Sequence, residues 1–260
     1  MTTTTPGSVP PPSTPHLSTP PPSTPSGTLG VVAARFALAS GVLGLVANTL
    51  FVAFWLITFP YWFDLTWGWL GSASDTVGIG MLLTLIPVLA GVRRLLPTSR
   101  AVTALTLVAV LALASLAVLQ LAGTQGLLDW SVQVRIVVVL LLPLYGWLIV
   151  VSSMAHRADA LPRTVTRLGL VLGVLWPAGL LLMLAGLLLG GSDPEYLEFG
   201  LPGGLLMAPG MLLGTLGWLA LPLWPLLLGR TALRRHRIHR RSASEPVAAI
   251  TTADPARSHR

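Results

Sequence analysis

Six long stretches of apolar residues alternate with short polar segments along the chain. They lie at about residues 36–58, 76–95, 102–122, 134–154, 167–190 and 204–228. A helix needs about 20 residues to cross a hydrocarbon core roughly 30 Å thick, and each stretch reaches about that length. The composition agrees, because 53% hydrophobic and 10% charged residues leave too little polar surface for a water-soluble protein. The sequence therefore predicts an all-α integral membrane protein, a bundle of six transmembrane helices.

The charges between these stretches alternate in sign along the chain. The second and fourth loops and the segment after the sixth stretch carry arginines: Arg93, Arg94, Arg100, Arg157, Arg163, Arg167 and six more between 230 and 241. The first, third and fifth loops carry carboxylates and no basic residue: Asp64, Asp75, Asp129, Asp193, Glu195 and Glu198. Short loops rich in arginine stay in the cytoplasm during insertion. The pattern predicts a multi-pass protein of the cell membrane with both termini in the cytoplasm.

The first 30 residues differ from the six-helix domain, which we place at 31–229. They contain no charged side chain and are dominated by Thr, Ser and Pro, with Pro-Pro-Pro-Ser-Thr-Pro at 10–15 and again at 20–25. Such a composition predicts a disordered tail with polyproline II character. We expect a spacer. The alternative is docking to an aromatic groove, or phosphorylation of Ser13, Thr14, Ser23 or Thr24.

Residues 230–260 form a basic juxtamembrane segment followed by a second tail, which is predicted to be disordered from 242 onward. The segment 230–241 begins where the sixth stretch leaves the membrane. Its main expected role is a stop-transfer and topology signal. The alternative is binding of anionic lipid headgroups by Arg234, Arg235, Arg237, Arg240 and Arg241, with the segment continuing helix six along the membrane surface. The net charge of +7 does not indicate nucleic acid, since it sits in this segment and the loops.

The sequence offers little to support an enzyme. The chain has no cysteine, and all five histidines lie in the tails or at the cytoplasmic rim. No apolar stretch carries a carboxylate near its centre, and we find no phosphate-binding loop, no His-Glu-x-x-His and no Gly-x-Ser-x-Gly motif. We therefore expect no catalytic activity, no cofactor and no bound metal.

A few polar residues within or beside the apolar stretches are candidates for ligand binding: Asn48, Asp75, Gln120 and Arg135. An unpaired amide is costly in hydrocarbon, so Asn48 should face the bundle. There it would make an interhelical hydrogen bond or line a water-filled cavity. Arg135 would reach the interface and pair with a loop carboxylate, or would line an outer vestibule for a small anionic or zwitterionic ligand.

The first outer loop is rich in aromatic residues, among them Trp67 and Trp69. Such rings concentrate at the headgroup level, so an interfacial belt is the default expectation. The alternative is a lip that binds a ligand or a partner. The candidate partner-binding residues of the outer loops are Asp64, Trp67, Trp69, Glu195 and Glu198.

Proline and glycine indicate how the helices bend and pack. Proline occurs within the stretches or at their edges, at Pro87, Pro143, Pro177, Pro209, Pro222 and Pro225, which predicts kinks. Glycines recur four residues apart at Gly169 and Gly173, Gly186 and Gly190, and Gly210 and Gly214. This spacing predicts that helices five and six each approach a neighbour closely.

Two functions remain open from the sequence. The first is a non-catalytic structural or regulatory partner in the membrane, whose tails or outer loops contact another protein. The second is a permease or channel-like subunit for a small polar or anionic solute. A polar stripe through the bundle would favour the permease, and a dry interior would favour the partner.

Overall fold

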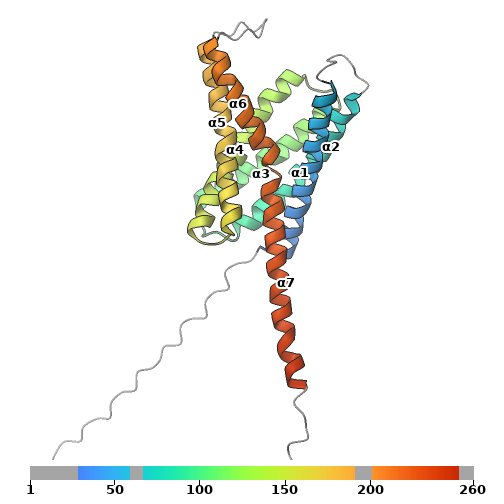
Figure 1. The fold of residues 1–260 in the computed structure, drawn as a ribbon, viewed down its shortest axis with the longest axis vertical. Coiled ribbons are helices and arrows are strands. Elements are labelled where there is room, and N and C mark those ends of the chain that lie inside the picture. The colour runs from blue at the N-terminus through green and yellow to red at the C-terminus, as the bar shows by residue number, and fades with distance from the viewer. Residues whose placement is uncertain (1–28, 59–66, 191–200, 252–260) are drawn as a thin grey trace, which may run out of the picture.

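The computed structural model describes residues 29–58, 67–190 and 201–251, and these residues form helices joined by short turns (Figure 1). The helices are α1 (Val31–Thr58), α2 (Gly68–Arg93), α3 (Arg100–Thr124), α4 (Trp130–Arg157), α5 (Arg163–Gly190), α6 (Leu201–Ala220) and α7 (Leu223–Thr251). Within this described part, six helical segments are long and apolar enough to cross a membrane. The predicted six-helix membrane bundle is confirmed.

Several helices extend beyond the apolar stretches that predicted them. For example, α4 ends at Arg157 rather than at 154, and α5 begins at Arg163 rather than at 167. Backbone hydrogen bonding continues past the edge of the hydrocarbon, so the hydropathy pattern marks the apolar part of a span and not its ends.

The sixth span consists of two helices. α6 and α7 are separated by a turn at Leu221 and Pro222, and the two halves pack against different neighbours. α6 lies along α5, whereas α7 lies along α1. Figure 1 shows α6 beside α5 at one end of the bundle and α7 passing α1 at the other end.

The remaining contacts arrange the spans in a ring. α1 packs against α2, α2 against α3, α3 against α4, and α4 against α5. The divided sixth span then closes the ring, because its two halves contact α5 and α1. Each end of the ring is defined by its charges. We call the end with Arg93, Arg94, Arg100, Arg157 and Arg163 the arginine-rich end, and the opposite end, where α2 and α4 begin, the arginine-poor end.

Glycines allow a close contact between α5 and α6. A Cβ atom added to Gly179 would lie 2.5 Å from the backbone nitrogen of Gly214, and one added to Gly210 would lie 2.8 Å from the carbonyl oxygen of Gly179. A Cβ on Gly186 would lie 2.8 Å from the carbonyl oxygen of Gly203. Backbones this close require glycine. The prediction that helices five and six each approach a neighbour closely is confirmed, and the structure shows that they approach each other.

The interior is filled with apolar side chains toward the arginine-rich end. The fully buried residues there include Val88, Leu89, Leu148, Val151 and Leu172. Trp147 of α4 and Trp224 of α7 meet edge to face, with centroids 5.9 Å apart, and Trp147 Nε1 donates a hydrogen bond to Thr106 Oγ1 at 3.0 Å. This half of the bundle is therefore closely packed.

α7 extends well past the end predicted for helix six at 228. It includes the basic segment 230–241 and reaches Thr251, within the part of the chain for which the sequence predicts a tail. Near the bundle, His236 Nε2 donates a hydrogen bond to the carbonyl oxygen of Leu29 at 2.7 Å. Beyond that contact α7 continues straight away from the bundle (Figure 1). The predicted tail at 1–30 falls almost wholly outside the described residues.

Candidate functional site

The break in the sixth span leaves backbone carbonyls without their usual helical donors. Leu221 N donates to Trp218 O at 3.1 Å instead of to Gly217 O, and Pro222 has no N–H. In an unbroken helix the N–H of residue 223 would reach Leu219 O, but the turn separates α6 from α7 at this point. The oxygens of Gly217 and Leu219 thus need partners from other helices.

Two neighbouring helices supply these partners. Asn48 of α1 donates from Nδ2 to Leu219 O at 2.9 Å. Tyr145 of α4 donates from its hydroxyl to Gly217 O at 3.3 Å. The break is therefore satisfied from two sides, which agrees with the rule that irregular backbone in a membrane must find hydrogen bonds within the protein. Asn48 makes the interhelical hydrogen bond that is one of its two predicted roles.

A pocket of about 270 Å³ lies directly beside this break. All six spans line it. Its polar lining residues are Asn48, Ser74, Asp75, Gln120 and Gln133, and its aromatic ones are Phe51, Trp176 and Trp218. The pocket runs from the arginine-poor ends of α2, α3 and α4 toward the middle of the bundle, where Trp176 and Trp218 lie.

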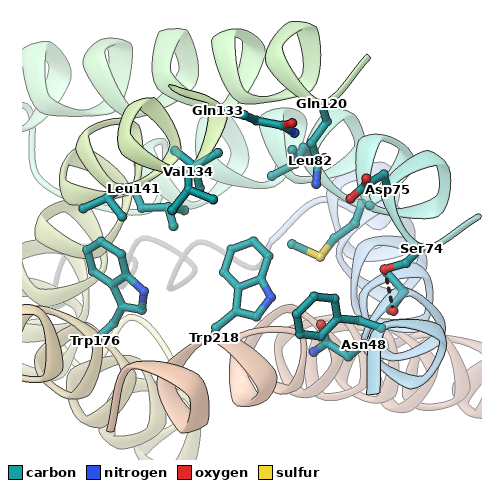
Figure 2. Close-up of a pocket in the computed structure, with 16 residues that line it drawn as sticks. Asn48, Ser74, Asp75, Leu82, Gln120, Gln133, Val134, Leu141, Trp176 and Trp218 are labelled. Carbon is teal, nitrogen blue, oxygen red and sulfur yellow. Dashed lines mark hydrogen bonds between the residues drawn. The ribbon is translucent and has the colours of Figure 1, made fainter. Parts of the chain in front are cut away.

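One side of the pocket is polar. Figure 2 shows Asp75, Gln120 and Gln133 grouped there, each from a different helix. Gln120 Oε1 is buried and has no hydrogen-bond partner among the described residues. Gln133 is only 8% exposed. An unpaired acceptor is costly in a finished interior, so Gln120 Oε1 is available to a polar group that enters the pocket.

Glycines make room for the two carboxamides. A Cβ atom on Gly78 would lie 3.3 Å from Gln120 Nε2, and one on Gly123 would collide with the amide of Gln133. Ser74, by contrast, is already bonded, because its hydroxyl donates to Ala47 O at 3.0 Å. The free hydrogen-bonding capacity of the polar side thus lies with Asp75, Gln120 and Gln133.

The opposite side is aromatic. Trp176 stacks on Tyr145 with the ring centroids 4.9 Å apart and the planes 2° from parallel, and it is 8% exposed. Trp218 stands across the pocket from the polar group (Figure 2). Because Tyr145 also bonds the backbone of α6, the aromatic side and the break in the sixth span form one connected unit.

The structure brings together three of the four residues predicted to bind a ligand. Asn48, Asp75 and Gln120 line the same pocket, whereas Arg135 is exposed and is not among the lining residues. Sequence reasoning missed Gln133, Trp176 and Trp218. The available signal for Gln133 was a carboxamide at the same depth as Gln120, at the arginine-poor end of the next span.

The other candidate residues lie away from the pocket. Trp67 and Trp69 are 41% and 58% exposed at the start of α2, with centroids 6.5 Å apart. Asp64, Glu195 and Glu198 lie outside the described residues. On α7, Arg234, Arg235 and Arg237 are exposed, while Arg240 and Arg241 belong to the helix but have no described side-chain placement.

The fold and the pocket define a class, that of a multi-pass helical membrane protein with a mixed polar and aromatic pocket among its spans. No protein-family model, curated protein or solved structure matches the chain. The function must therefore be argued from the pocket itself.

Proposed function

We propose that the protein is a permease-type subunit that binds a small polar solute in the six-helix pocket. The observation that carries this proposal is the group of Asp75, Gln120 and Gln133 with free hydrogen-bonding capacity inside the bundle. A protein that served only as a membrane scaffold would gain stability by filling this space with apolar side chains. Polar and ionisable groups inside a membrane bundle usually mark solute pathways.

The divided sixth span supports movement of the solute as well as binding. We propose that the pocket opens toward the arginine-poor end, where its polar lining residues lie, because the packed core around Val88, Leu89 and Leu148 fills the other end. Carriers commonly place their sites beside broken helices, where a small rotation of one half opens the opposite path. In this protein the break at Leu221 and Pro222 lies next to Trp218, which lines the pocket.

The orientation of the protein is part of the same proposal. We place the arginine-rich end and both termini in the cytoplasm of a cell-membrane protein, following the arginine distribution. The pocket then opens to the outside. We propose no catalytic role, because none of the described lining residues is arranged as a nucleophile with its base.

The absence of native cysteine allows a direct test by labelling in intact cells. A membrane-impermeant thiol reagent should label Gln133→Cys, because water reaches that side of the pocket. The matched control is Leu113→Cys, which lies in the packed core and should stay unlabelled. If Gln133→Cys reacts no faster than Leu113→Cys, the pocket is closed to water and the proposal is wrong.

Two further variants check the orientation. Ser72 is exposed near the start of α2, and Thr98 is exposed in the turn between α2 and α3. Ser72→Cys should react in intact cells. Thr98→Cys should react only after the cells are permeabilised, and the reverse pattern would place the pocket on the cytoplasmic side.

The second candidate function is the structural or regulatory partner, and α7 favours it. This helix carries the exposed Arg234, Arg235 and Arg237 at the arginine-rich end and continues past the bundle. Such a helix offers a basic surface to anionic headgroups or to a cytoplasmic protein. Deleting residues 1–29 or the end of α7 while leaving the pocket intact would separate the two functions, since only a partner role depends on these segments.

A further inference from the structure

The described lining of the pocket contains one acidic residue and no basic one. Asp75 is its one ionisable lining residue within the described part of the chain, and no Arg, Lys or His lines it. No ion pair or hydrogen bond to the Asp75 carboxylate occurs among the described residues. A carboxylate inside a bundle is stabilised by an opposite charge nearby, so the position of Asp75 favours a cationic ligand over an anionic one.

The uncharged polar groups of the pocket also suit a positively charged ligand. Gln120 Oε1 is a buried acceptor without a donor, and Gln133 presents a second carboxamide from the facing helix. An N–H group of a ligand that approached Asp75 would meet these oxygens. An anionic ligand would instead face the carboxylate, with no basic side chain to offset the repulsion.

The aromatic side suits an organic cation rather than a bare ion. Trp176 and Trp218 lie across the pocket from the polar group (Figure 2), and Phe51 also lines the pocket. Tryptophan faces attract ammonium groups, and aromatic walls are the usual means of holding quaternary ammonium ligands. A hydrated metal ion would gain little from these rings, and a single carboxylate with amides is a sparse ligand set for a divalent metal.

The volume limits the size of the ligand. At about 270 Å³, the pocket is smaller than the roughly 300–1,000 Å³ typical of sites for drug-sized molecules. We infer that the pocket binds a small organic cation, an amine or a quaternary ammonium compound, between Asp75 and the tryptophans Trp176 and Trp218. This inference rests on the proposed solute-binding function and names the chemical class of the solute.

The test uses the purified full-length protein and two probes, tetramethylammonium chloride and ethanolamine hydrochloride. Both should raise the unfolding temperature and give measurable dissociation constants by titration calorimetry. Sodium chloride and sodium acetate at the same ionic strength should not. Asp75→Asn should weaken the binding of both cations about tenfold or more, because it removes the one charged group among the described residues that line the pocket.

Gln120→Leu separates the contributions within the site. Gln120 makes no hydrogen bond among the described residues, so this variant should fold normally. It should weaken ethanolamine, which has N–H donors, and leave tetramethylammonium, which has none, almost unchanged. Trp218→Leu should weaken both probes.

Several outcomes would overturn the inference: equal binding by Asp75→Asn and the unmodified protein, a sodium acetate response as large as that of the cations, or no response to either cation. If Asp75→Asn does not fold, protection of Gln133→Cys from the thiol reagent replaces it. The cations must then slow labelling and acetate must not. Labelled Gln133→Cys without cation binding would refute only the inference, whereas unlabelled Gln133→Cys would refute the proposed function too.

Discussion

Asn48 of α1 donates a hydrogen bond of 2.9 Å to the carbonyl oxygen of Leu219, in the last turn of α6. The two residues are far apart in sequence, and the bond joins the first span to the point where the sixth span divides. Asn48 also lines the pocket. A change in pocket occupancy and a change in the angle between α6 and α7 would therefore act on the same side chain.

Replacing Asn48 with leucine should destabilise the bundle by about 0.6–2 kcal/mol, the range measured for interhelical hydrogen bonds in membranes. The variant loses the donor and leaves Leu219 O without a partner among the described residues. The measurement is reversible unfolding in mixed micelles. Thr49→Val is the matched control, because the Thr49 hydroxyl bonds only within its own helix, to Leu45 O. Equal stability of the two variants would contradict the role given to Asn48.

Tyr145→Phe tests the second bond to the break. The change removes the hydroxyl that donates to Gly217 O and keeps a ring that can stack on Trp176. We expect a loss of about 0.5–1.5 kcal/mol, typical of one hydrogen bond. Tyr145→Leu removes the stacked ring as well and should cost clearly more. If phenylalanine and leucine cost the same, the ring stack contributes nothing and the aromatic side is not a stabilised unit.

The sequence was sufficient to predict the fold class because span length and hydrophobicity follow directly from the thickness of the bilayer. Glycine spacing predicted that helices five and six each approach a neighbour closely, since backbone approach depends on local residue size, but it did not predict that they contact each other. The inward position of Asn48 followed from the cost of an unpaired amide. The acceptor of the Asn48 hydrogen bond could not be predicted in the same way. Leu219 O lacks its usual helical donor only because the sixth span divides at Leu221 and Pro222, which the structure shows.

Gln133 and Arg135 show why the pocket itself could not be read from the sequence. Both are polar residues in the first turns of α4, and the sequence predicted a ligand-binding role only for the charged one. Residues two apart on an α-helix are separated by a rotation of about 200° around its axis. They point to nearly opposite sides, so only one of the pair can face the bundle interior. The structure places Gln133 in the pocket lining and leaves Arg135 exposed. Periodicity alone could not decide between them, because the surrounding residues of α4 are apolar on every side.

Alanine substitutions at two glycines should have opposite effects on stability. Gly179→Ala places a methyl group 2.5 Å from the backbone of α6 and should cost about 1–3 kcal/mol through overpacking. Gly146→Ala adds its methyl group to open space and should stabilise α4 by up to about 1 kcal/mol through helix propensity. Unfolding of both variants in the same micelles checks the prediction. A neutral Gly179→Ala would show that α5 and α6 can separate without loss.

The basic face of α7 makes a prediction that is independent of the pocket. Arg234, Arg235 and Arg237 are exposed just beyond the bundle, where each basic group near an anionic surface contributes about 1 kcal/mol. Replacing all three with glutamine should reduce the anionic lipid retained by the purified protein, measured by mass spectrometry of the protein–lipid complex.

Arg135→Gln is the matched control, because Arg135 is also exposed but belongs to the arginine-poor end. The triple variant should keep its affinity for the pocket ligand, since none of the three arginines lines the pocket. If the triple variant retains as much lipid as the unmodified protein, the arginines of α7 act only as a topology signal. If Arg135→Gln loses as much lipid as the triple variant, retention depends on total charge and not on this helix.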